Sequence, residues 1–192
     1  NDDSACLLTD IIISSNGELK NISCGANEDS SAKRRFSVYS TDIDGNGSLD
    51  VPFAEKLSGS DEYWIFDWYT YNKDGSRVKC ASTYHDYTDG WFFVLPDEWR
   101  DTVSIRREGT VSGERGTVFS SYEEETGKLT DRLTVYTLTD ENRTERAALD
   151  DRFVLMKSGT VVYAAKIMES DAVQQDIINR FRIISSEFNT GA

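Results

Sequence analysis

Histidine, cysteine and proline are scarce in this chain, and their scarcity argues against several classes of protein. Among 192 residues there are one His, three Cys and two Pro. The cysteines form no CxxC pair, which argues against a zinc site built on such pairs. No apolar stretch approaches the roughly 20 residues that a membrane helix requires, so we do not expect the chain to span a membrane. The low proline content, with 13 glycines, is typical of an ordered globular protein.

Basic residues are also in short supply. The chain has 34 Asp and Glu against 21 Lys and Arg, a net charge of −13. Such a surface repels phosphate backbones, so we expect no nucleic-acid partner. The charge is compatible with cations and calcium-rich surroundings, and equally with a soluble protein that simply carries negative charge.

The cysteines leave the cellular compartment open. Cys6 and Cys24 flank a predicted hairpin over residues 7–24 and could face each other, but the odd count leaves one thiol over. The chain begins with Asn1 rather than Met, which suggests a mature or trimmed chain from which an export signal has been removed.

Hydrophobic alternation predicts an α+β fold that is mostly antiparallel β. Asn16-Gly17 marks a type I′ turn between the first two strands. The best candidate for a boundary is residues 86–90, which separates a β-rich segment over residues 1–87 from an α+β segment over residues 88–192. Whether these are one domain or two stays open.

A longer helix is predicted near the end of the chain. Ser170 is a natural N-cap residue, and Asp171 favours the first turn. Apolar residues then recur at helical spacing, and they form one stripe that we expect to pack on a sheet. The stripe consists of Val173, Ile177, Phe181, Ile184 and Phe188.

The strongest chemical signal is an acidic loop over residues 42–50, with the sequence DIDGNGSLD. Asp42, Asp44, Asn46 and Asp50 carry oxygen-bearing side chains at positions 1, 3, 5 and 9, and the carbonyl of Ser48 at position 7 usually adds another ligand. Calcium takes six to eight hard oxygen ligands, so these residues predict a structural calcium site. The alternative is an Asn-Gly-rich hairpin turn without a metal.

This loop differs from an EF-hand. Position 12 is Phe53, where an EF-hand needs a bidentate Glu, and the flanking residues predict strands rather than helices. Gly45 and Gly47 allow the tight turn around an ion. Magnesium is less suitable, because it gives up its waters reluctantly.

Residues 38–52, VYSTDIDGNGSLDVP, resemble the FG-GAP/VCBS-type calcium loops of extracellular β-propeller blades. The resemblance implies ligand roles for the five loop residues named above, although one loop is not a propeller. Residues 90–99, GWFFVLPDEW, look like the entry segment of the Mog1/PsbP-like α+β family, and residues 183–188 agree with the C-terminus of that family. Members of the family serve as accessory or binding proteins without catalysis of their own.

The arrangement as a whole resembles a group of uncharacterised secreted lipoproteins of Gram-positive anaerobes, in which a similar acidic loop is followed by an aromatic strand and a GW-x-x-x-P-x-x-W segment. This resemblance implies an extracytoplasmic location, secreted or lipid-anchored at the cell surface. No lipobox is visible, because no apolar run precedes Cys6.

Catalysis is not expected. His85 is the single histidine and lies beside Asp86, with Asp89 nearby, but no GxSxG, SxxK or Cys-His signature accompanies it. We therefore expect a surface or hairpin histidine. A hydrolase with an unrecognised site is the least favoured alternative.

An aromatic strand over residues 63–71 offers another site. Trp64 and Trp68 share one face, and Tyr69 and Tyr71 share the other. The strand fits a two-sided core strand, or an exposed platform on which sugars stack. The sequence thus predicts a non-catalytic extracytoplasmic protein with structural calcium that binds an unknown protein or glycan, and a carbohydrate-binding module is the alternative.

Overall fold

The computed structural model confirms a β-rich α+β fold built from antiparallel strands. It describes residues 7–23, 33–34, 38–57, 64–109, 111–168 and 172–184. None of the helices within these ranges is long and apolar enough to cross a membrane. The predicted pairing of Cys6 with Cys24, the predicted N-terminal turn of the last helix at Ser170 and Asp171, and Phe188 lie outside the described residues.

The chain divides into two compact units that interleave along the sequence. The first unit consists of residues 1–55, 64–92 and 183–192, and the second of residues 56–63 and 93–182. The chain passes from the first unit to the second between Phe92 and Phe93, inside strand β8 (Trp91–Val94). It returns between Arg182 and Ile183, inside strand β14 (Phe181–Ile183).

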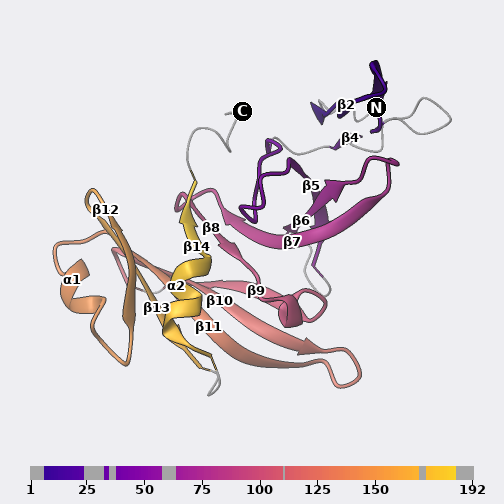
Figure 1. Ribbon diagram of the computed structural model, residues 1–192. Helices are drawn as coiled ribbons and strands as arrows, with labels where there is room; N and C mark the ends of the chain where they lie inside the picture. Colours follow the sequence, from indigo (N-terminus) through magenta and orange to yellow (C-terminus); the bar gives the residue numbers. More distant parts are fainter. Residues whose placement is uncertain are drawn as a thin grey trace, which may run out of the picture. The chain divides into compact units, whose positions relative to one another are not determined.

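A five-stranded sheet with the order β14-β8-β7-β6-β5 forms the centre of the first unit (Figure 1). The strands not yet defined are β5 (Asp50–Lys56), β6 (Trp64–Tyr71) and β7 (Arg77–Asp86). Two small antiparallel pairs precede them, β1 (Leu7–Leu8) with β4 (Lys33–Arg34) and β2 (Ile12–Ser15) with β3 (Glu18–Asn21).

The β2–β3 hairpin confirms the predicted turn. Asn16 and Gly17 both have positive φ angles, 53° and 80°. A type I′ turn requires this conformation at its two central residues, and Asn and Gly adopt it most readily.

Strands β6 and β7 pair along almost their whole length, with one irregularity. The register shifts between Trp68 and Tyr69 of β6, so Trp68 pairs with Ala81 and Tyr69 pairs with Lys79. Cys80 is the extra residue of this β-bulge. A bulge bends its strand and re-aims the side chains around it, and here it determines where the Cys80 thiol lies.

The second unit is built on a meander-like sheet with the order β12-β13-β11-β10-β9. Its two longest strands, β10 and β11, form a hairpin that stands out in Figure 1. The bounds are β9 (Val103–Glu108), β10 (Glu114–Glu123), β11 (Lys128–Leu138), β12 (Phe153–Ser158) and β13 (Val161–Ile167).

Aromatic rings fill part of the second unit's core. Phe93, Trp99 and Phe119 are all buried, and their ring centroids lie 5.4–6.3 Å apart. Trp99 belongs to a 3-10 turn, η1 (Asp97–Trp99), that directly follows Pro96. Offset aromatic contacts at these distances stabilise a core beyond the area that they bury.

The helices are shorter than the sequence predicts. Helix α1 (Arg143–Arg146) is a single turn. The last helix, α2 (Gln174–Arg180), ends where Phe181 takes up an extended conformation and β14 begins. The prediction that the helix continues through Ile184 is wrong, because Phe181-Arg182-Ile183 also alternates with period two and joins the sheet instead.

Candidate functional site

The acidic loop projects from the start of strand β5 in the first unit. An isolated antiparallel bridge between Thr41 and Asp50 closes the loop, with backbone N···O distances of 3.1 and 2.8 Å. The residues between them form bends rather than a helix or strand. The loop is therefore held at its base by the same strand that enters the sheet.

Asp42 organises the backbone of the loop. Its Oδ1 accepts the amide protons of Gly45 and Asn46 at 2.8 and 3.0 Å, and its Oδ2 accepts that of Gly47 at 2.8 Å. Gly45 and Gly47 have φ angles of 79° and 84°, a conformation that L side chains rarely adopt. Asp42 thus wraps the chain into a tight turn without help from any other element.

Asp44, Asn46 and Ser48 continue this pattern along the exposed rim. Asp44 Oδ1 accepts the Asn46 amide proton, and Asp44 Oδ2 accepts a proton from Asn46 Nδ2, both at 3.0 Å. Asn46 Oδ1 accepts the Ser48 amide proton at 2.7 Å. The Ser48 carbonyl oxygen accepts none of these hydrogen bonds within the loop.

Asp50 differs from the other loop residues because it is fully buried. Its Oδ2 accepts the Ile43 amide proton at 3.1 Å, and its Oδ1 accepts the hydroxyl proton of Thr70. Thr70 comes from strand β6, so the buried carboxylate connects the loop to the sheet. A buried carboxylate is costly unless hydrogen bonds or an opposite charge compensate it.

The Cys80 thiol of strand β7 completes a cluster with two loop carboxylates. One ligand atom from each of Asp44, Asp50 and Cys80 lies within 4.8 Å of the others. The Sγ also donates to the backbone oxygen of Trp68 at 3.4 Å, and burial raises the pKa of the thiol to about 11. Thr70 and Cys80 could not be predicted as neighbours of the loop, because the pairing of β6 with β7 and the bulge at Cys80 have no signature in the sequence near the loop.

The charges of the loop are unbalanced. No Lys or Arg forms an ion pair with Asp42, Asp44 or Asp50 within the part of the chain that the structure describes. Two carboxylates no more than 4.8 Å apart repel each other by about 1 kcal/mol in water-like surroundings and about 3 kcal/mol near a protein surface. A cation between Asp44 and Asp50 would turn this repulsion into attraction, so the residues present fit a metal ion.

His85 is a core residue of the β6–β7 hairpin, so the prediction of a hairpin position is confirmed and that of a surface position is wrong. Its ring stacks on Phe92 at 5.1 Å and meets the edge of Phe66 at 4.9 Å. Trp68 Nε1 donates to Thr83 Oγ1 at 2.8 Å, and the Thr83 hydroxyl also forms a hydrogen bond with His85 Nε2 at 2.9 Å. Burial lowers the pKa of His85 to about 3, so it is a poor general base near neutral pH.

The structure excludes one residue, Trp68, from the proposed ligand platform. Trp68 is fully buried, whereas Trp64 at the start of β6 is 37% exposed. Tyr69 is half-buried and lies under the Arg77 guanidinium, 4.5 Å from its ring centroid, in contact with Phe53. The assignment of Trp68 to a sugar-stacking surface is wrong, because its ring has no exposed face.

Tyr71 is half-buried at the end of the same strand. Between Ile65 and Trp68 every residue of β6 is buried, which supports the two-sided core strand that the sequence offered as the alternative. The aromatic residues of this strand thus serve mainly in packing.

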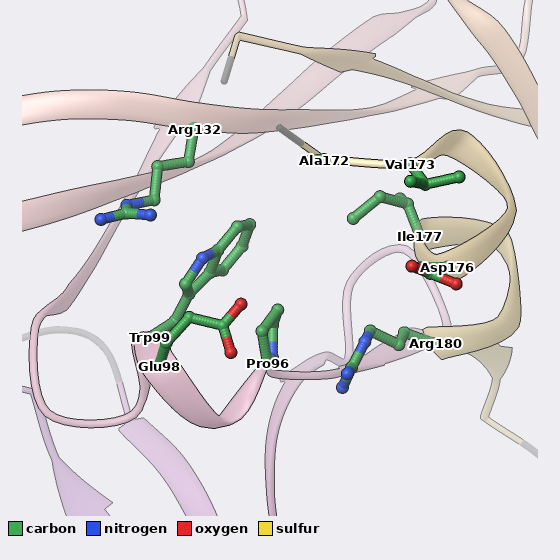
Figure 2. A pocket seen from close by; sticks show the side chains of 9 residues that line it. All are labelled: Pro96, Glu98, Trp99, Arg132, Ala172, Val173, Asp176, Ile177 and Arg180. Atoms are coloured by element: carbon green, nitrogen blue, oxygen red, sulfur yellow. The ribbon is translucent and has the colours of Figure 1, made fainter. Parts of the chain in front are cut away.

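The second unit contains a separate pocket of about 200 Å³. Figure 2 shows its lining residues, which come from η1, strand β11 and helix α2. Sequence reasoning missed this pocket, because residues from three distant segments form it.

Comparison with known proteins adds little. No family model and no curated protein matches the chain. One solved structure, the crystal structure of a protein of unknown function from Bacteroides fragilis, aligns at 14% identity with a TM-score of 0.28. The alignment covers 50% of this chain and 76% of that one, and a likeness this weak carries no argument about fold or function.

Proposed function

We propose that this chain is a non-catalytic extracytoplasmic protein, secreted or surface-anchored, whose acidic loop binds calcium as a structural ion and which acts by binding a protein or glycan. One observation carries the metal assignment. The carboxylate of Asp50 is fully buried and lies close to that of Asp44, and neither has a cationic partner among the described residues.

The chemistry of the loop favours calcium over other ions. Asp44 and Asp50 offer hard carboxylate oxygens, and the Ser48 carbonyl and Asn46 amide oxygen lie in the same loop. Calcium accepts such mixed oxygen sets at flexible geometry, whereas magnesium demands a near-ideal octahedron. Bound at this position, the ion would join the loop to the sheet through Asp50 and its hydrogen bond to Thr70.

Separate observations support the extracytoplasmic location and the absence of catalysis. The extracytoplasmic assignment rests on the resemblance of residues 38–52 to calcium loops of extracellular proteins. The single histidine has a pKa near 3 and lies among aromatic rings, so it is unsuited to acid–base catalysis at neutral pH.

Calcium should raise the melting temperature of this protein. At about 100 times the dissociation constant, an ion that binds only the folded chain adds about 2.7 kcal/mol of stability. For a chain of this size that corresponds to a rise of about 5–10 °C. Thermal unfolding with excess calcium and with a chelator measures the difference, and Asp44→Asn should abolish most of it.

Two control variants separate this effect from others. Asp74 also holds a tight turn, with its Oδ1 accepting the Ser76 amide proton at 2.9 Å, but it lies outside the acidic loop. Asp74→Asn should therefore leave the calcium effect intact. Cys80→Ser should also preserve it, since calcium prefers oxygen to sulfur. Identical melting curves with calcium and with chelator would contradict the proposal.

A further inference from the structure

The pocket of the second unit has an apolar floor. Pro96, Trp99 and Ile177 are buried and contribute their side chains to it. Figure 2 shows Trp99 and Ile177 on opposite sides of the space, from η1 and from helix α2. Because the core rings Phe93 and Phe119 hold Trp99 in place, this floor is formed before any ligand arrives.

Four charged side chains surround that floor, two of each sign. Glu98 and Arg132 lie on the side of Trp99, and Asp176 and Arg180 lie on the side of helix α2 (Figure 2). Each side of the pocket therefore offers one carboxylate and one guanidinium. The lining carries two positive and two negative groups, so its net charge is close to zero.

The two guanidinium groups are fixed by neighbouring parts of the fold. Arg180 Nη1 donates to the backbone oxygens of Leu95 and Val94 at 3.2 and 3.5 Å. The Arg132 guanidinium lies over the Trp99 ring, 5.8 Å from its centroid, at a distance typical of a cation–π contact. Because both arginine side chains are already held in place, a ligand would lose less binding free energy to ordering them.

The two carboxylates remain available to a ligand. Neither Glu98 nor Asp176 forms an ion pair within the described residues, and both side chains are exposed at the rim. A ligand with an ammonium group could therefore pair with one of them. A carboxylate on the same ligand would find a guanidinium next to it.

We propose that this pocket binds a small zwitterion with an apolar body, of the size of a single amino acid. A ligand with one charge would bring that charge next to a like-charged group, and an uncharged apolar ligand would pair with none of the four charged groups. A zwitterion pairs with both signs while its apolar part covers Trp99 and Ile177. The volume of about 200 Å³ is below the roughly 300–1,000 Å³ of pockets that hold drug-sized ligands, which limits the ligand to this size.

The inference goes beyond the proposed function, which assigns no small ligand and no role to the second unit. It also makes no use of the acidic loop. Binding in this pocket is therefore tested separately from calcium binding.

Titration of the full chain with L-leucine and L-phenylalanine tests the inference. The ¹H–¹⁵N resonance of the Trp99 indole should shift in a saturable manner up to about 10 mM amino acid, where a site with a Kd of about 1 mM is nearly full. N-acetyl-leucine lacks the ammonium group and leucinamide lacks the carboxylate. Each should bind about tenfold more weakly or worse, because one charge-assisted hydrogen bond is lost.

Variants at two neighbouring acidic residues provide the matched control. Glu98→Gln should weaken amino-acid binding by about tenfold, whereas Asp97→Asn on the same turn should not, because Asp97 pairs with Arg100 and does not line the pocket. Both side chains are exposed, so both variants should fold. The inference is overturned if neither amino acid shifts the Trp99 resonance, if the blocked analogues bind equally well, or if the two variants behave alike.

Discussion

Replacing Trp68 with alanine should lower the free energy of unfolding by about 3–5 kcal/mol. The indole is fully buried in the first unit, and its Nε1 donates to Thr83 Oγ1 at 2.8 Å. The substitution therefore removes a large apolar group, leaves a cavity and takes a donor away from a buried hydroxyl. Equilibrium unfolding in urea measures the loss.

Two further variants separate the loss of the hydrogen bond from the loss of the ring and compare a buried with a partly exposed tryptophan. Trp68→Phe keeps a buried ring but loses the hydrogen bond, so it should cost less than the alanine variant. Trp64→Ala, on the same strand, should cost about 1 kcal/mol or less, since Trp64 is 37% exposed. If Trp68 instead belonged to a sugar-binding surface, Trp68→Ala would unfold like the parent chain and lose glycan binding.

The stability of the protein should fall as the pH drops below about 6.5, and His85 should account for a large share of that fall. Burial among aromatic rings lowers the pKa of His85 from 6.5 to about 3 in the folded chain. Above pH 6.5 the histidine is neutral in both folded and unfolded chains, so its contribution is fully present. Between pH 6.5 and 3 the unfolded chain binds a proton that the folded chain excludes, and this favours unfolding.

The slope of this effect is about 1.4 kcal/mol per pH unit, and it approaches a total of about 4–5 kcal/mol near pH 3. Carboxylates also titrate in this range, so the measurement compares two proteins. Urea unfolding of the parent chain and of His85→Phe at pH 7, 6, 5 and 4 isolates the contribution of the histidine. The variant should show the shallower pH dependence, and equal slopes would mean that His85 is not kept neutral by burial.

Local patterns in the sequence predicted local structure well. Asn16-Gly17 identified a hairpin turn whose two φ angles are both positive. The hydrogen bonds that Asp42 makes in the acidic loop also reach no further than five residues along the chain. Each of these features depends on contacts between near neighbours.

Features that depend on distant segments could not be predicted. Cys80 lies near Asp44 and Asp50 through strand pairing and a bulge, and the pocket around Trp99 gathers side chains from three segments. The end of the last helix at Arg180 was missed for a related reason. A segment that fits both helical and alternating patterns is decided by the sheet that it joins, which a single sequence does not reveal.

The faces of the aromatic strand illustrate the same limit. Alternation predicted a strand over residues 63–71, and the structure has β6 over Trp64–Tyr71, but alternation could not say whether its faces were covered. Burial of Trp68 and the position of Arg77 over Tyr69 depend on neighbouring strands. The choice between a core strand and a ligand platform therefore required the structure.

Crystals grown with excess calcium test the central claim most directly. We expect an ion in the acidic loop, with carboxylate oxygens of Asp44 and Asp50 at about 2.3–2.6 Å. An ordered loop with no ion between Asp44 and Asp50 at saturating calcium would contradict the claim. An ion held instead by the Cys80 sulfur at about 2.3 Å would also contradict it, because that distance and ligand indicate zinc.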